Sequence, residues 1–126
     1  MAIIEHGFYI LDEQFFVDFP DEYLKGNKTE NRPHYYCLTD PKTGLAWMIP
    51  LSNQIEKYER LIDERLSHGR PCDILHSMVI AGRKQCFLIQ DMFPITENYI
   101  KREFIVNSNH LKLLDDSQIF IINKKA

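Results

Sequence analysis

The chain has 126 residues, of which 44% are hydrophobic and 26% charged, and its formal net charge is −3. This length supports one domain with a hydrophobic core, and the acidic balance argues against a protein that coats nucleic acid non-specifically. No segment approaches the roughly 20 apolar residues of a membrane span, and the first residues lack the basic and apolar parts of a secretion signal. The three cysteines show no paired spacing, as is typical of a reduced chain. We therefore expect a single cytoplasmic domain over residues 1–126, without membrane association.

The charges are unevenly distributed along the chain. Residues 1–22 contain six acidic residues and no lysine or arginine, whereas the remainder has 15 basic against 12 acidic residues. A local basic groove is therefore compatible with the acidic total.

The first third of the sequence predicts short strands and a polar loop. Residues 7–11 are typical of a strand, and Asp12 is placed to cap a helical turn over residues 13–17. Residues 20–33 are polar and rich in turn formers, which indicates a surface loop. Residues 34–39 and 45–49 flank the turn sequence 40–44, so we expect an antiparallel hairpin.

A helix should follow this hairpin. Asn53 is a good N-cap, and Glu56 three residues later completes a capping box. Ile55, Tyr58, Ile62 and Leu66 fall on one helix face, with Leu61 beside them, and the helix should end near residues 68–69.

The second half predicts another hairpin and two helical segments. Residues 74–80 and 86–90 should pair around a turn at residues 81–84, and a helical segment should run from about residue 96 to 104. Residues 110–114 suggest a short strand, and Asp115 and Asp116 should cap a last helix. Antiparallel strands with appended helices indicate an α+β fold, either a compact, highly curved sheet or a small barrel with peripheral helices.

The junction after residue 49 is a candidate anion site. Free N–H groups at a helix N-terminus bind anions, Ser52 adds a hydroxyl, and Lys57 adds a positive charge. The alternative is that Ser52 and Asn53 only cap the helix, which is their commonest use. Glu56 would also compete with a phosphate at this helix end.

Arg32 and His34 form a second candidate. Pro33 favours an extended conformation at Arg32, so both side chains should point to the same side of a strand. Arginine can neutralise a phosphate while histidine transfers a proton near neutral pH. The alternative is a solvated edge strand in which an aromatic neighbour contacts the core.

Other sequence signals argue against a metal or nucleotide cofactor. His68, Cys72 and His76 are spaced by four, but Gly69 and Pro71 break the helix that such spacing needs. No phosphate-binding glycine loop or dinucleotide fingerprint is present in the sequence. We expect no cofactor and no metal.

Five segments, in order and spacing, resemble the ToxN/AbiQ family, the toxin component of type III toxin–antitoxin systems, and within it the CptN-like branch. The resemblance runs from about Phe8 to Lys125. The segments are Gly26-Asn27-Lys28, Asn31-Arg32-Pro33-His34-Tyr35-Tyr36, Trp47-Met48-Ile49-Pro50-Leu51-Ser52-Asn53, Glu56-Lys57-Tyr58 and Phe87-Leu88-Ile89-Gln90-Asp91-Met92-Phe93-Pro94-Ile95-Thr96.

The resemblance implies a barrel-like fold similar to the MazF/Kid endoribonucleases. It also implies a metal-independent endoribonuclease toxin that cleaves single-stranded cellular RNA, with no DNA expected as a partner. Its inhibitor would be a small structured antitoxin RNA of pseudoknot-type repeats, which the toxin processes and binds in a closed ribonucleoprotein assembly.

The resemblance also suggests site residues. The family often has the motif Pro-Leu-Thr-Ser followed closely by lysines. Ser52 matches the threonine of this motif, and Asn53 stands where the family has the second hydroxyl residue. Lys57 lies a residue or two further into the helix than the lysines of the family. Where ToxN-type members have Pro-Lys, this chain has Pro33-His34.

In such an enzyme the 2′-OH attacks the adjacent phosphate, so no protein nucleophile is needed. We expect His34 to transfer a proton, and Arg32, Ser52 and Lys57 to hold and neutralise the phosphate. The candidates for RNA contact are Asn53, Tyr36, Lys25, Lys28 and Arg83. The main alternative is a non-catalytic α+β module that binds RNA or protein; a barrel toxin with a protein target is a third possibility.

Overall fold

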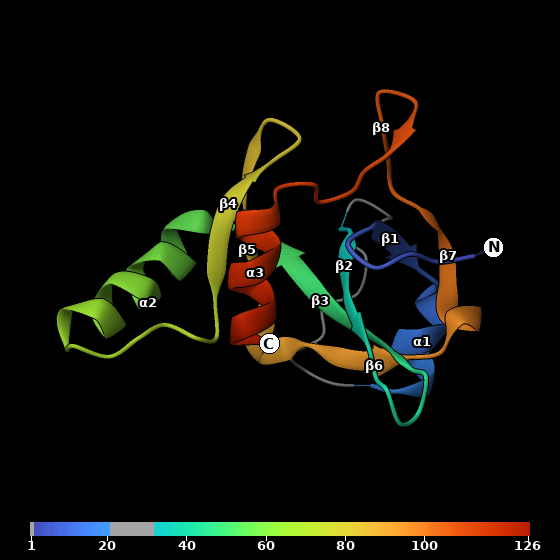
Figure 1. Cartoon of the computed structure of the whole chain (residues 1–126), viewed down its shortest axis with the longest axis horizontal. Helices are drawn as coiled ribbons and strands as arrows, with labels where there is room; N and C mark the ends of the chain where they lie inside the picture. Colours follow the sequence, from blue (N-terminus) through green and yellow to red (C-terminus); the bar gives the residue numbers. More distant parts are fainter. Residues whose placement is uncertain (1, 21–31) are drawn as a thin grey trace.

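The computed structural model describes residues 2–20 and 32–126 (Figure 1). Its strands are β1 (Phe8–Leu11), β2 (His34–Thr39), β3 (Ala46–Ser52), β4 (His76–Ile80), β5 (Arg83–Phe87), β6 (Phe93–Ile95), β7 (Ile100–Glu103), β8 (Ile105–Val106) and β9 (Asn109–His110). Its helices are α1 (Glu13–Asp18), α2 (Ile55–Ser67) and α3 (Asp116–Lys125), with 3₁₀ turns η1 (Ile89–Asp91) and η2 (Glu97–Tyr99). Within the described ranges, no helix is long and apolar enough to span a membrane.

The fold is α+β, as the sequence predicted, and it is built on an antiparallel sheet of seven strands. The main strand order is β4-β5-β3-β2-β1-β7, and β6 pairs separately with β3. β8 and β9 form a small hairpin of their own. No pairing between β4 and β7 joins the two ends of this sheet within the described part of the chain, so the strand order is open.

β3 is the strand that links the two parts of the sheet. One of its edges pairs with β2, and its other edge pairs first with β6 and then, at Leu51 and Ser52, with β5. Pro50, which has no N–H to donate, lies where β3 changes from β6 to β5, and its carbonyl accepts a hydrogen bond from Leu88 N at 2.9 Å. The sheet therefore continues past the proline and delivers Ser52 to the start of α2.

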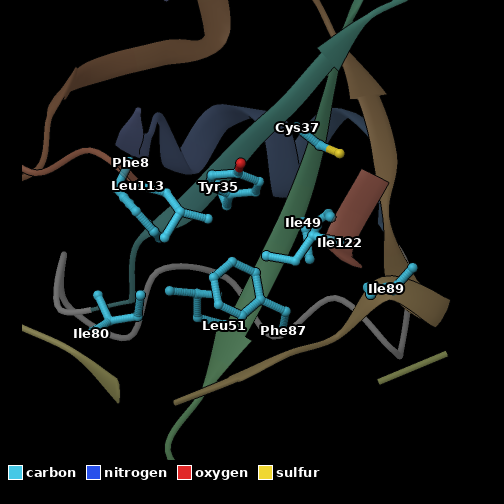
Figure 2. Packing of buried hydrophobic residues seen from close by; sticks show 10 residues of the cluster. All are labelled: Phe8, Tyr35, Cys37, Ile49, Leu51, Ile80, Phe87, Ile89, Leu113 and Ile122. Carbon is cyan, nitrogen blue, oxygen red and sulfur yellow. The ribbon is translucent and has the colours of Figure 1, made fainter. Parts of the chain in front are cut away.

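Three clusters of buried side chains form the core. The first joins the central strands to α3, and Figure 2 shows its members, which include Tyr35, Leu51, Phe87 and Ile122. The second is aromatic and lies between α1 and strands such as β2, β3 and β6. The third packs the apolar side of α2, including Tyr58, against Cys86 and Leu88. The third cluster fixes the position of α2 relative to the sheet.

Several sequence predictions are confirmed. Asp12 accepts a hydrogen bond from Gln14 N and caps α1, and Asp115 caps α3 through Ser117 N and Gln118 N. The hairpin of β2 and β3 forms, and α2 ends with His68 as its C-cap.

The hairpin turn between β4 and β5 is shorter than predicted. It consists of Ala81 and Gly82, whose φ angles of 51° and 80° suit a tight two-residue turn. Arg83 and Lys84 were predicted in the turn but belong to β5.

The predicted helix over residues 96–104 is wrong. Only Glu97–Tyr99 is helical, as a single 3₁₀ turn, and Ile100–Glu103 is strand β7. β7 pairs with β1, whose second edge would otherwise lack a partner. Tertiary pairing therefore overrides the local helical tendency of this segment.

We predict that Gly7→Ala destabilises the fold by about 1–3 kcal/mol because of overpacking. A Cβ at Gly7 would lie 2.9 Å from the ring of His110. That ring is held in place, since Nε2 donates to the Phe8 carbonyl at 2.9 Å and Nδ1 lies 3.1 Å from a Glu103 oxygen. Urea unfolding measures the loss.

His110→Ala provides the matched background for this prediction. In that background Gly7→Ala should cost less, because the two closest crowding atoms are gone and only the Tyr9 ring, 3.1 Å from the added Cβ, remains. An equal loss in both backgrounds would show that the ring of His110 is not the cause.

Candidate functional site

Three buried polar side chains mark the candidate site. Within the described residues, the buried polar or charged side chains are Arg32, His34 and Ser52, which are 9%, 2% and 4% exposed. Burying such groups costs free energy, and proteins accept this cost most often at functional sites. All three are among the four residues that the sequence predicted as catalytic.

Tyr58 lies close enough to interact with two of these residues. The charge of Arg32 lowers the pKa of both His34 and Tyr58, and Ser52 also lowers the pKa of the Tyr58 phenol. The backbone explains the proximity, because His34 pairs with Pro50 across β2 and β3, two residues before Ser52. We call Arg32, His34, Ser52 and Tyr58 the polar cluster.

His34 is a neutral imidazole enclosed by aromatic rings. Its centroid lies 6.0 Å from that of Phe16 and 5.7 Å from that of Phe93. Burial, followed by the positive charge of Arg32, lowers the pKa of His34 to about 3, while a hydrogen bond to the Arg32 backbone opposes the shift. The ring is therefore uncharged at neutral pH.

The hydrogen bonding of His34 leaves one ring nitrogen available. Nδ1 is buried and has no hydrogen-bond partner within the described part of the chain. A neutral imidazole carries its proton on one of its two ring nitrogens. In the tautomer protonated at Nε2, Nδ1 carries a lone pair that can accept a proton or a hydrogen bond.

The start of α2 differs from the predicted capping box. The N-cap is Gln54, and no side chain caps it, so the box of Asn53 and Glu56 is wrong. Instead, Ser52 Oγ accepts from Gln54 N at 3.2 Å, and the Asn53 carbonyl accepts from Ile55 N at 2.9 Å. Because β3 extends to Ser52, the helix starts one residue later than expected, and the capping oxygen comes from the strand.

Tyr58 is the member of the polar cluster that sequence reasoning did not assign to the site. Its spacing predicted a place on the apolar face of the helix, and its ring does pack in the third core cluster. Ser52 and Arg32 nevertheless affect the pKa of its phenol, and both lower it. Burial and then the negative charge of Asp91 raise the pKa of Tyr58. A tyrosine one and a half turns after a buried serine is a weak signal that only the tertiary structure makes specific.

A cleft of about 490 Å³ adjoins the polar cluster at Arg32. Among residues 2–20 and 32–126, no acidic side chain lines it, and the lining comes from four separate parts of the chain: Arg32, Pro33, Leu51, Asn53, Arg83, Gln85 and Phe104. A second hollow of about 230 Å³ shares five of these residues and extends to Val106 and Leu111. We call the two together the arginine groove. It reaches the ends of the β4–β5 and β8–β9 hairpins, which project from the same side of the molecule in Figure 1.

Lys57 lies near this site but lines a different hollow. It shares a depression of about 610 Å³ with Asn53, Gln54, Ile55, Glu56 and Arg60. Its Nζ is 5.2 Å from the ring centroid of Tyr58. Asn53 therefore lies between the arginine groove and the hollow that holds Lys57.

Tyr36 is not placed for RNA contact in this structure. Its ring is 6% exposed and packs in the second core cluster, 6.5 Å from the centroid of Tyr9. Its hydroxyl hydrogen-bonds Thr39. The alternation of β2 turns Tyr36 into the aromatic core, so this candidate is withdrawn. Lys25 and Lys28 lie outside the described residues.

The cysteines are buried as free thiols. Burial raises the pKa of both Cys37 and Cys86 to about 11, so these two thiols are protonated and poorly nucleophilic at neutral pH. Residues 2–20 and 32–126 contain no group of three or more His, Cys, Asp or Glu side chains suited to a metal ion.

Comparison of the sequence with models of known protein families and with curated proteins finds no match. The chemistry of the site is therefore inferred from the side chains of this chain.

We predict that acid destabilises the protein through His34. The folded-state pKa of about 3 lies below the ordinary value of 6.5, so between these pH values the unfolded chain binds a proton that the folded chain does not. Stability should fall as pH decreases from 6.5 towards 3. His34→Phe should show a smaller loss of Tm between pH 7 and pH 5 than the wild type.

The pH range between about 3 and 6.5 separates the effect of His34 on stability from that of most other titratable groups. The carboxylates with lowered pKa values, Asp18, Asp40 and Asp115, lose their contribution only below about pH 4. Burial also lowers the pKa of His76, so His76 also reduces stability as the pH falls. This effect is present in both the wild type and His34→Phe and does not distinguish them. Identical pH slopes for the wild type and His34→Phe would contradict the assignment.

Proposed function

We propose that this protein is a metal-independent endoribonuclease toxin of the ToxN/AbiQ type, which cleaves single-stranded RNA by attack of the 2′-OH on the adjacent phosphate. The observation that carries this proposal is that Arg32, His34 and Ser52 are the buried polar residues of the described chain, and that Arg32 lines a groove in which the described residues include no acidic side chain. Burying three polar or charged side chains together adds little to the stability of the fold, because each of them loses its hydration.

The polar cluster contains groups suited to this reaction. Arg32 stays charged when buried and neutralises phosphoryl oxygens. The hydroxyl of Ser52 donates to the same oxygens, and Nδ1 of the neutral His34 accepts the proton of the 2′-OH. A phosphate bound next to Arg32 offsets the charge that lowers the pKa of His34, so the bound substrate makes this base stronger.

The arginine groove suits the path of a single strand. Arg83 adds positive charge at its rim, Asn53 and Gln85 offer amide groups, and Phe104 offers a half-buried ring. Such a combination of cationic and aromatic groups binds single-stranded nucleic acid. Lys57 extends the positive surface on the side of α2.

The finer parts of the proposal follow from the family resemblance. A sheet curved into a small barrel like that of the MazF/Kid endoribonucleases would be the fold of such a toxin. A structured antitoxin RNA of pseudoknot-type repeats, processed by the toxin and bound in a closed assembly in the cytoplasm, would be its inhibitor.

The second candidate is a module that binds RNA or protein without cleaving it. The depressed pKa of His34 favours this reading, because burial makes the imidazole a weak base in the unbound protein. Both candidates predict RNA binding in the arginine groove, so only a cleavage assay distinguishes them.

We predict that the purified protein cleaves single-stranded RNA in the presence of EDTA and leaves 2′,3′-cyclic phosphate ends. Ser52→Ala should lower the rate about 10²-fold or more, because a donor to the phosphate is lost. Gel analysis and mass spectrometry of the fragments measure both effects. Ser52→Thr is the matched control, since it keeps the hydroxyl and should retain most of the activity.

RNA that stays intact at high protein concentration, but is bound, would exclude the nuclease and favour the binding module. Circular dichroism of each variant separates loss of chemistry from loss of folding, because the Ser52 hydroxyl also accepts a hydrogen bond at the start of α2.

We predict that Arg83→Ala weakens binding to single-stranded RNA and reduces the salt dependence. Loss of one phosphate contact should lower the slope of log K against log salt concentration by about 0.7. Binding is measured by fluorescence anisotropy at several salt concentrations, with the Ser52→Ala protein to prevent cleavage.

Lys84→Ala is the matched control for charge. Lys84 follows Arg83 on β5, but its ammonium group pairs with Glu59 and it does not line the groove. Both variants remove one positive charge, so an equal effect on RNA binding would show that the groove has no special role.

A further inference from the structure

A further hollow, of about 650 Å³, lies between α1 and the segment of β6 and η2. Within the described ranges, it shares no lining residue with the arginine groove or with the hollow that holds Lys57. Its volume is in the range of sites that bind small molecules, which are mostly apolar and carry a few polar groups. We call it the aromatic hollow.

Four aromatic residues line the aromatic hollow and contact one another. Phe15 and Phe19 come from the end of α1, and their ring centroids are 5.3 Å apart. Phe93 stacks on Phe15, with centroids 5.0 Å apart and an interplanar angle of 19°. Tyr99 meets the rings of Phe15 and Phe19 edge to face, at 5.4 Å and 6.0 Å. Each ring is therefore held by at least one other ring, and the wall is formed before any ligand binds.

Asp18 gives the aromatic hollow a negative charge. The Tyr99 hydroxyl donates to Asp18 Oδ2 at 2.6 Å, and Gln14 Nε2 donates to Oδ1 at 2.7 Å. Within the described part of the chain, Asp18 is the one charged side chain that lines the hollow. Residues 1–22 also contain six acidic residues and no lysine or arginine, so the surrounding segment adds further negative charge. The hollow is therefore complementary to a cation and repels the phosphates of RNA.

We propose that the aromatic hollow binds a small molecule that carries a quaternary ammonium group. The faces of aromatic rings attract such cations, and the carboxylate of Asp18 adds a charge at the edge of the ring cluster. A primary ammonium group fits less well, because it is strongly hydrated and needs hydrogen-bond acceptors. Both oxygens of Asp18 already accept hydrogen bonds from the protein. A quaternary ammonium group has no N–H and requires only the charge and the rings.

The single tryptophan of the chain provides a direct measurement of binding. Trp47 pairs with Pro94 across β3 and β6, and Pro94 lines the aromatic hollow. Choline is the probe, and its uncharged isostere, an alcohol in which a tert-butyl group replaces the trimethylammonium group, is the matched ligand control. In titrations of the whole protein, choline should change the Trp47 fluorescence saturably and bind at least about 5-fold more tightly than the isostere. Ethanolamine, which carries a primary ammonium group, should bind more weakly than choline.

Two variants separate the contributions of charge and ring. Asp18→Asn removes the charge at nearly constant shape and should weaken choline binding at least about 3-fold. Glu97→Gln is the matched control, since it removes an exposed negative charge from η2 but does not line the hollow. Phe19→Leu keeps an apolar side chain and removes a ring that is 55% exposed, so it should weaken choline binding without unfolding the protein. Thermal unfolding of each variant verifies the fold.

Three results would overturn the proposal. The first is no saturable change for the wild type up to about 10 mM choline, checked by calorimetry. The second is equal affinity for choline and its uncharged isostere, which would make the hollow a general apolar site. The third is an equal effect of Asp18→Asn and Glu97→Gln, because the charge inside the hollow would then have no special role. None of these results bears on RNA cleavage, since no residue of the polar cluster lines the aromatic hollow.

Discussion

The pairing of β3 with three other strands is the constraint on which the rest of the structure depends. Its first half is held between β2 and β6, and its last two residues pair with β5. Pro50 sits at the change of partner, where its missing N–H removes no bond from the β5 ladder. Because β5 pairs with the strand as far as Ser52, the first turn of α2 has a fixed origin. The hydroxyl, the helix and Tyr58 are positioned by the sheet and not by a flexible loop.

The polar cluster is costly for the fold, and its cost explains its arrangement. A buried imidazole, a guanidinium and a hydroxyl each lose hydration, which only partners inside the protein can replace. The Ser52 hydroxyl has such a partner, since it accepts from Gln54 N. Nδ1 of His34 has none within the described residues. An unsatisfied buried nitrogen is rare in native proteins, and it is most simply explained where a ligand completes the bonding.

Sequence reasoning was strongest where local chemistry decides the structure. Asp12 and Asp115 were recognised as caps, and the β2–β3 hairpin was recognised from its turn, because these signals act within a few residues. It failed where distant pairing decides: Ile100–Glu103 became a strand because β1 needed a second neighbour. The same limit applies to the site. Arg32, His34 and Ser52 were selected from the sequence, but the position of Tyr58 near them depends on how α2 packs on β5, and no local pattern reports it.

In the proposed reaction, Arg32 couples substrate binding to proton transfer. It lines the groove, and its charge lowers the pKa of His34 and favours the ionised form of Tyr58. In the unbound protein its charge makes His34 a weaker base. A phosphate that binds to Arg32 brings negative charge close to the imidazole and reverses that effect, because opposite charges favour the protonated ring. In the proposed reaction, His34 would therefore be least basic when the site is empty and more basic when the phosphate is in place.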